Sequence, residues 1–222
     1  TGYILALQFD LLPDNLRAAA ATRLAENVER QGHLTTGFVG TGLICPMLTQ
    51  IGRSDLAWDL LLTNGYPSWL FSVKNGATTI WERWDGWTPD HGFQDSSMNS
   101  FNHYSLGSVG AWLYSGAGGI QPDDASPGYK HFFLAPQFTP RLARAKATLV
   151  SSYGVIASGW RIKNGRIFYD VTIPPNSSAT LILPAPTQDV RQSGRPIGAA
   201  DGSTTRLSLA AGTYHFSLPL LR

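Results

Sequence analysis

A hairpin signature lies in residues 160–169, which read Trp160-Arg161-Ile162-Lys163-Asn164-Gly165-Arg166-Ile167-Phe168-Tyr169. Apolar and polar residues alternate on both sides of Asn164-Gly165. Two-residue hairpin turns favour Asn-Gly because both central positions take a positive φ. The stretch therefore predicts two antiparallel strands, residues 154–163 and 166–173, and decides the fold of the second half of the chain.

The period-two alternation continues on both sides of this hairpin. We expect further strands at residues 130–134, 145–152, 179–183 and 213–218. Turn residues stand at Pro174-Pro175-Asn176-Ser177 and at Asp201-Gly202. Short strands with turns at this spacing are typical of two packed sheets. Residues 121–222 are therefore predicted to form a small antiparallel β-sandwich.

The first half of the chain shows helical signals instead. Pro13 suits the first turn of a helix and Gly32 its end, with apolar residues at four-residue steps between them. Further helices are expected at residues 41–51, 55–64 (capped by Ser54), 67–75, and from Ser100 or Asn102 to 116. Short consecutive helices joined by glycine-rich turns are typical of stacked αα-hairpins. The predicted fold class is α + β and multidomain, with residues 1–120 forming part of a helical hairpin bundle or toroid.

Composition limits the classes of function. Charged residues make up only 14% of the 222 residues, below the usual quarter, which suggests a piece of a larger protein. The chain also opens at Thr1 without an initiator methionine. With a net charge of +2 and no dense Lys/Arg cluster, nucleic acid is not an expected partner. No run of 18 apolar residues predicts a membrane span, and the compartment is not indicated.

No sequence motif points to a cofactor or a metal. The chain has no HExxH, no CxxC and no glycine-rich phosphate loop. The single Cys45 excludes an internal disulfide and lies in an apolar run, so we expect a buried, inert thiol. We therefore expect neither a cofactor nor a metal site.

The segment Thr78–Trp87 holds the candidate chemistry. It places Trp81, Trp84 and Trp87 around Glu82. Flat indole rings suit the apolar faces of sugars, and glycosidases use pairs of carboxyl groups. The alternatives are an ion pair from Glu82 to Arg83 or to a neighbouring helix, and tryptophans that form one buried helix face. His103 is expected in the first turn of the last helix, as a site residue or as a capping or core histidine.

Two longer segments carry a resemblance to a known family. Residues 75–86, Asn75-Gly76-Ala77-Thr78-Thr79-Ile80-Trp81-Glu82-Arg83-Trp84-Asp85-Gly86, and residues 100–114, which begin Ser100-Phe101-Asn102-His103-Tyr104, closely resemble the bacterial α-L-rhamnosidases of glycoside hydrolase family 78. The resemblance covers essentially the whole chain. It implies an (α/α)6 barrel followed by a C-terminal β-sandwich, and hydrolysis of terminal α-L-rhamnosyl linkages with inversion.

The resemblance also implies roles for individual residues. Glu82 matches the general base that activates water, and His103 matches a histidine that lines the rhamnose pocket. Trp84 and Trp87 fall where the pocket wall is expected, and Trp81 is included among the substrate-binding residues. The implied substrate is a rhamnose-containing glycoside or polysaccharide.

The chain departs from the family pattern in one respect. The family's general acid glutamate lies in an acidic, tryptophan-containing segment upstream, and nothing here corresponds to it. We therefore expect residues 1–120 to be the C-terminal half of the barrel, packed against a missing N-terminal part, and the isolated chain to be inactive. The alternatives are a polysaccharide lyase that uses Asn102-His103-Tyr104, and a non-catalytic carbohydrate-binding fragment.

Overall fold

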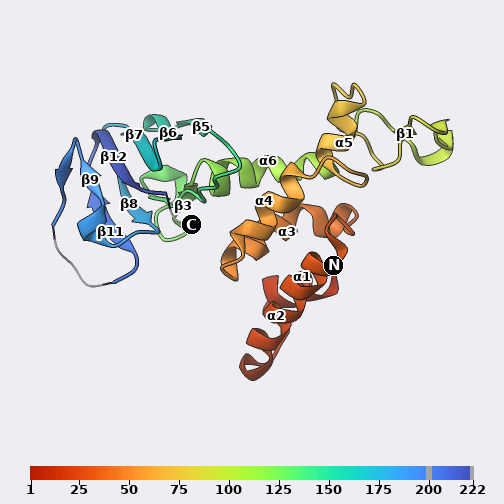
Figure 1. Ribbon diagram of the computed structural model, residues 1–222, viewed down its shortest axis with the longest axis horizontal. Helices are drawn as coiled ribbons and strands as arrows, with labels where there is room; N and C mark the ends of the chain where they lie inside the picture. Colours follow the sequence, from red (N-terminus) through yellow and green to blue (C-terminus); the bar gives the residue numbers. More distant parts are fainter. Residues whose placement is uncertain (199–201, 221–222) are drawn as a thin grey trace. The chain divides into compact units, whose positions relative to one another are not determined.

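The computed structural model describes residues 1–198 and 202–220, and the chain divides into two compact units (Figure 1). The first unit, Thr1–Trp112, is helical, and the second, Leu113–Arg222, consists mainly of strands. The helices of the first unit are α1 (Gly2–Gln8), α2 (Asp14–Gln31), α3 (Phe38–Gln50), α4 (Ser54–Leu62), α5 (Trp69–Lys74) and α6 (Val109–Trp112).

Local capping signals place the ends of α2 where we expected them. Pro13 immediately precedes the helix, and Gly32 ends it in the left-handed conformation, with φ of 66° and its N–H bonded to the Val28 carbonyl. Ala20, Leu24 and Val28 form the buried face, whereas Leu16 is half exposed. The predicted helix is therefore confirmed, with a shorter buried face than its apolar spacing suggested.

Helix α3 forms the centre of the first unit, next to α1 and α4 (Figure 1). Helix α3 packs against α4, and Met47 and Leu48 of α3 and Trp58 and Leu60 of α4 are almost fully buried. Cys45 is also buried here, and burial raises the pKa of its thiol to about 12. The inert thiol that we predicted is thus consistent with the structure.

The helix boundaries differ from the prediction in several places. Helix α3 begins at Phe38 rather than near residue 41, and Ser54 is the first residue of α4 rather than its cap. Helix α5 begins two residues after Pro67, capped by Ser68, whose Oγ accepts a hydrogen bond from the Phe71 N–H at 3.0 Å. Helix α1 was not predicted.

The last predicted helix is the largest error in this half. It does not begin at Ser100 or Asn102, because residues 100–103 are irregular and hydrogen-bond to residues 79–82. Helical structure begins with the 3₁₀ turn Ser105–Ser108, continues as α6, and ends in the π-helical turn Leu113–Ala117. His103 therefore precedes the helix instead of lying in its first turn.

The second unit contains a six-stranded antiparallel sheet with the strand order β10-β9-β12-β7-β6-β5. Its strands are β5 (Arg144–Ser151), β6 (Gly154–Lys163), β7 (Arg166–Ile173), β9 (Arg191–Gln192), β10 (Arg195–Pro196) and β12 (Gly212–Pro219). The Asn164-Gly165 turn joins β6 and β7 with φ of 51° and 70°, and Lys163 pairs with Arg166. The hairpin prediction is confirmed.

A four-stranded sheet accompanies it, with the order β11-β8-β4-β3. Its strands are β3 (Ile120–Pro122), β4 (His131–Leu134), β8 (Ser178–Leu183) and β11 (Thr205–Leu209). Strands β4 and β8 run parallel, which the antiparallel prediction did not anticipate. Strands β3, β9, β10 and β11 were not predicted, and Asp201 of the expected Asp201-Gly202 turn lies outside the described residues.

Each sheet of the second unit buries one face. Trp160 and Tyr169 are almost fully buried on the six-stranded sheet, as are Phe132 and Leu181 on the four-stranded sheet. Two sheets that each bury an apolar face stabilise one another by packing those faces together. Among the described residues, no helix has the length and apolar character needed to cross a membrane.

Candidate functional site

Hydrogen bonds between two irregular segments, residues 79–82 and 100–103, bring the chain at Glu82 close to the chain at His103. The Glu82 N–H donates to the Ser100 carbonyl at 2.8 Å, and the His103 N–H donates to the Ile80 carbonyl at 2.9 Å. The Thr79 hydroxyl also donates to the Phe101 carbonyl. These bonds take the place of the helix expected from Ser100 or Asn102, and the two backbone bonds fix the chain at Glu82 relative to the chain at His103.

The carboxylate of Glu82 is held at one oxygen. Its Oε2 accepts a hydrogen bond from the Ser100 N–H at 2.8 Å, while Oε1 makes no hydrogen bond within the described part of the chain. Arg83 turns instead to Asp85, with Nε and Nη2 donating to the two carboxylate oxygens at 2.8 and 2.9 Å. Those bonds hold the pKa of Asp85 below its ordinary value. The alternative of an ion pair between Glu82 and Arg83 is therefore wrong.

Glu82 borders a cavity of about 310 Å³. The aromatic and apolar side chains that line it are Phe38, Tyr66, Trp84, Met98 and Leu106, and the charged ones are Glu82, Arg83 and Asp85. An apolar cavity with a few convergent polar groups is the usual form of a small-ligand site. The arrangement is suited to a sugar, because an apolar wall and a carboxylate with a free oxygen face the same space.

The three tryptophans lie in different environments. Trp84 lines the cavity, donates from Nε1 to the Thr36 carbonyl at 3.1 Å, and packs edge-on against Trp69. Trp81 is buried, with 7% of its surface exposed, and packs edge-on against Phe101. Trp87 is half-buried in the two-residue strand β1 (Trp87–Thr88), which pairs with β2 (Gly92–Phe93). Only Trp84 of the three borders the cavity with Glu82.

His103 lies at one side of the same region. Its ring stacks on Phe38, a cavity residue, with centroids 4.9 Å apart, and on Tyr104 at 5.4 Å. Its Nδ1 accepts a hydrogen bond from the Ser105 N–H at 3.3 Å. A neutral ring that accepts at Nδ1 carries its proton on Nε2. His103 can therefore present a hydrogen-bond donor to a ligand.

The loop between the two segments is closed at its base. Asn99 Nδ2 donates to the Gly86 carbonyl at 2.9 Å, and the Gln94 N–H donates to the same carbonyl at 3.1 Å. The other side-chain atom of Asn99, Oδ1, is buried without a hydrogen-bond partner. A Cβ on Gly86 would lie 2.8 Å from that oxygen, so any larger residue there would displace the Asn99 amide. This closure sets the position of residue 100, which holds Glu82.

Sequence reasoning missed most of the cavity wall. Phe38 and Tyr66 come from segments remote from Glu82 in the chain, and nothing local marks them as site residues. Met98 lies in the long connection between Glu82 and Ser100, and connections of that length often carry functional residues. Within the described residues, no three His, Cys, Asp or Glu side chains are grouped closely enough to hold a metal ion.

Comparisons with known proteins agree on one family. The sequence profile of the bacterial alpha-L-rhamnosidase 6 hairpin glycosidase domain matches residues 1–117, and that of the bacterial alpha-L-rhamnosidase C-terminal domain matches residues 119–198. A curated alpha-L-rhamnosidase of Streptomyces avermitilis is 39% identical over 98% of the chain. One of Formosa agariphila is 39% identical over 97% of the chain.

A solved structure shows the same fold. The crystal structure of Streptomyces avermitilis alpha-L-rhamnosidase complexed with L-rhamnose superimposes with a TM-score of 0.88 at 37% identity, over 97% of this chain. The chain spans 21% to 24% of the length of these relatives.

These matches confirm the predicted fold class, a six-hairpin glycosidase domain followed by a β-sandwich. They do not favour the polysaccharide lyase or the non-catalytic alternative. The six-hairpin profile alone covers more than half of the 222 residues. The chain therefore belongs to the bacterial α-L-rhamnosidase family.

Proposed function

We propose that this chain supplies the water-activating half of an α-L-rhamnosidase site, with Glu82 as the general base of an inverting hydrolysis. The observation that carries the proposal is the position of its carboxylate. Oε2 is held by the Ser100 N–H, and the side chain borders a cavity with an aromatic wall. A base held at one oxygen keeps the other available for a water molecule.

The reaction sets a requirement that this chain does not meet alone. Inversion needs two carboxyl groups roughly 6.5 to 9.5 Å apart, one protonating the departing oxygen and the other activating water on the opposite face of the sugar. Glu82 takes the second role. The acid is expected from a part of the enzyme outside these 222 residues, since the family's acid-bearing segment has no counterpart here.

In this proposal, some of the predicted substrate-binding residues contact the sugar and others support the site. Trp84 provides an apolar wall for the rhamnose ring and its methyl group. His103 donates from Nε2 to a sugar hydroxyl, supported by its stacking on Phe38. Trp87 contributes at the edge of the site, through the β1–β2 hairpin. Trp81 does not contact the sugar. It is buried against Phe101 and supports the segment that carries Glu82.

The same proposal covers the domains. Residues 1–120 form the C-terminal half of the barrel and residues 121–222 the β-sandwich. Several large apolar side chains of the first unit are exposed, among them Phe9, Leu11, Val73, Phe93 and Tyr104. Exposed apolar surface of this kind marks an interaction surface, and the partner we propose is the remainder of the barrel. The substrate class is a rhamnose-containing glycoside or polysaccharide.

A chimera tests the catalytic proposal. In it, this chain replaces the matching segment of the Streptomyces avermitilis relative, which aligns with 98% of the chain. Glu82→Gln in the chimera should lower the hydrolysis of an aryl α-L-rhamnoside at least about a hundredfold, the scale of a lost general base. The matched control is Asp90→Asn, which neutralises an exposed carboxylate in the connection between Glu82 and Ser100 and should retain activity. Near-normal turnover of the Glu82→Gln chimera contradicts the proposal.

A further inference from the structure

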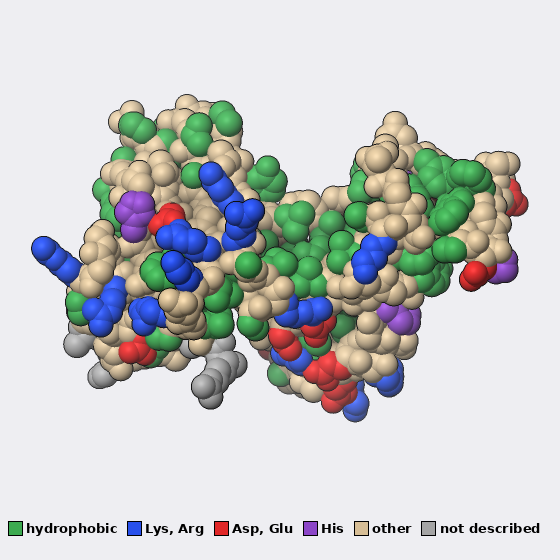
Figure 2. Space-filling view, turned by 45° about the horizontal axis from the view of Figure 1, so that its top comes forward, with side chains coloured by type: hydrophobic (Ala, Val, Ile, Leu, Met, Phe, Trp, Pro, Cys, Tyr) green, Lys and Arg blue, Asp and Glu red, His purple; other side chains and the backbone are tan. Residues whose placement is uncertain are grey.

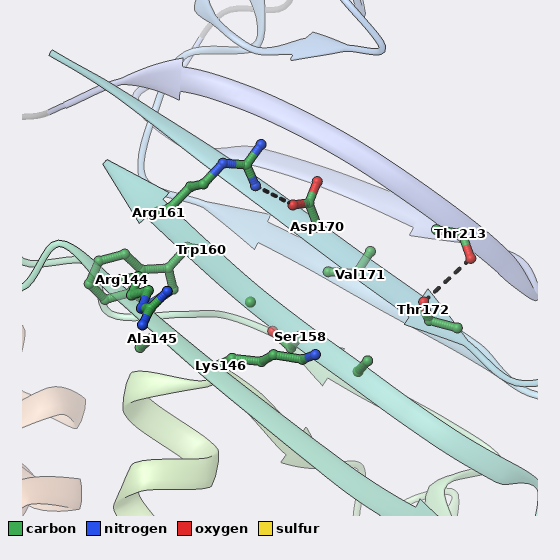
Figure 3. Close-up of a pocket in the computed structure, with 12 residues that line it drawn as sticks. Arg144, Ala145, Lys146, Ser158, Trp160, Arg161, Asp170, Val171, Thr172 and Thr213 are labelled. Atoms are coloured by element: carbon green, nitrogen blue, oxygen red, sulfur yellow. Dashed lines mark hydrogen bonds and ion pairs between the residues drawn. The ribbon is translucent and has the colours of Figure 1, made fainter. Parts of the chain in front are cut away.

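A hollow lies on the outer face of the six-stranded sheet in the second unit (Figure 3). Its volume is about 320 Å³, and it spans β5, β6, β7 and β12. Ala157 and Gly159 form its floor, because the larger residues that alternate with them on β6, such as Trp160, point into the core. Arg144, Lys146 and Arg161 stand around this floor (Figure 3).

Gly159 has no conformational reason to be glycine. The register from Arg144↔Arg161 to Ser151↔Gly154 runs without a bulge, and Gly159 is not among the described glycines with positive φ. Glycine inside a strand lowers its stability and often marks a close approach of a ligand or of another chain segment. Here a Cβ would lie 3.3 Å from Cγ of Lys146. Gly159 therefore keeps the floor low, with the lysine stem lying against it.

The charges around the hollow are not balanced. Arg161 and His215 both donate to Asp170, at 2.5 and 2.7 Å. Burial raises the pKa of Asp170, but these two hydrogen bonds outweigh it and hold the pKa below its ordinary value. Arg144 and Lys146 make no ion pair within residues 1–198 and 202–220. Arg144, Lys146 and Arg161 against the single carboxylate of Asp170 leave two positive charges without a partner. Figure 2 shows Lys and Arg side chains gathered over this unit.

The two unpaired cations, Arg144 and Lys146, and the paired Arg161 lie close together on one face of the sheet. Arg144 and Arg161 are cross-strand partners, and Lys146 follows Arg144 by two residues on the same face, about 7 Å along the strand. Across the hollow, the Thr172 and Thr213 hydroxyls hydrogen-bond at 3.3 Å. A ligand lying across β5 to β12 would therefore meet cations first and hydroxyl groups next.

We propose that this groove binds an acidic oligosaccharide, with Arg144 and Lys146 holding the carboxylate of a uronic acid and the threonine hydroxyls contacting the sugar. The inference that the ligand carries a carboxylate rests only on the two unpaired cations. The inference that the ligand is a carbohydrate rests on the proposed function, since an enzyme that acts on rhamnosyl linkages meets acidic sugars when its substrate is an acidic polysaccharide.

Calorimetric titration of the 222-residue chain with tri-galacturonate tests this. Binding is expected, and the Arg144→Ala/Lys146→Ala variant should weaken it about tenfold or more, as charge-assisted hydrogen bonds are lost. Arg195→Ala, on exposed β10 of the same sheet, is the control and should bind within about twofold of the parent chain. Gly159→Thr keeps every charge, suits a strand and raises the floor, so it should also weaken binding.

Three further probes separate the sources of the signal. Fully methyl-esterified tri-galacturonate should not bind, because it keeps the sugars but lacks the charge. Tri-glutamate and inorganic sulfate carry charge without sugar and should bind much more weakly than tri-galacturonate. Equal binding of tri-glutamate, no binding of tri-galacturonate, or binding that survives both the double variant and Gly159→Thr would overturn the proposal. Hydrolysis of a neutral aryl rhamnoside by the chimera should not change in the double variant, so failure of the groove stays distinguishable from failure of the Glu82 site.

Discussion

Asn99→Ala should slow catalysis with little effect on folding. The side chain ties the base of the 86–99 loop through a 2.9 Å hydrogen bond to the Gly86 carbonyl, and its second bond, to the Gln94 carbonyl at 3.4 Å, is too long to add much. The next residue, Ser100, holds Oε2 of Glu82. Greater mobility at residue 99 therefore disturbs the adjacent Ser100 N–H, which positions the carboxylate of the proposed base.

The magnitude follows from the hydrogen bonds. Loss of the bond to Gly86 costs about 1 kcal/mol, which corresponds to about fivefold in rate if the loss falls on the transition state. The alanine also removes Oδ1, a buried acceptor without a partner, and such an atom costs about 1 to 3 kcal/mol. The two effects oppose each other in folding, so the free energy of unfolding should change little while kcat falls.

The assay compares kcat and KM for an aryl rhamnoside in the chimera, together with thermal unfolding. Asn99→Asp should be worse than Asn99→Ala, because it turns a carboxylate toward the Gly86 and Gln94 carbonyls in place of a donor. Gln94→Ala is the control within the loop, since the Gln94 bond to Gly86 comes from its backbone N–H. A change in KM with kcat unaltered, or an Asn99→Asp variant as fast as the parent, refutes the reasoning.

Three other results are expected. Trp84→Phe in the chimera should raise KM about fivefold, because it removes the Nε1 bond to the Thr36 carbonyl, worth about 1 kcal/mol, and shifts the cavity wall; unchanged steady-state kinetics would contradict this. Ser158→Ala should lower the free energy of unfolding by about 1 to 3 kcal/mol, because Ser158 Oγ joins the Gly118 carbonyl and the buried Tyr169 hydroxyl at 2.5 and 2.8 Å. Tyr169→Phe should cost less, since Ser158 keeps its bond to Gly118, and denaturant unfolding that ranks the two variants in the opposite order would contradict the account. The isolated 222-residue chain should release no appreciable p-nitrophenol from an aryl rhamnoside, and clear release would show that no further carboxyl group is needed.

Local chemistry predicted the elements that depend on neighbouring residues. The Asn164-Gly165 hairpin and the end of α2 at Gly32 were predicted correctly because neighbouring residues in the sequence determine each of them. The helix expected from Ser100 or Asn102 failed because residues 100–103 pair with residues 79–82, a contact that no local pattern reveals. The parallel pairing of β4 with β8 was missed for the same reason.

The site was predictable only in its chemical centre. The tryptophan-rich segment pointed to Glu82, and the family resemblance added His103. The resemblance placed Trp84 at the pocket wall, and Trp84 does border the cavity. It did not distinguish Trp81, which is buried, because both tryptophans have similar polar and aromatic neighbours along the chain. Phe38 and Tyr66 reach the cavity only through the packing of distant segments.

The most direct test of Glu82 is chemical rescue. In the Glu82→Ala chimera, water is no longer activated, but azide needs no base and can attack the anomeric carbon from the vacant side while the general acid protonates the leaving group. We predict that azide restores release of the aryl alcohol and yields β-L-rhamnosyl azide, identified by nuclear magnetic resonance. Failure of azide to accelerate a folded Glu82→Ala chimera, or an α-configured azide product, would contradict the assignment of Glu82 as the base of an inverting enzyme.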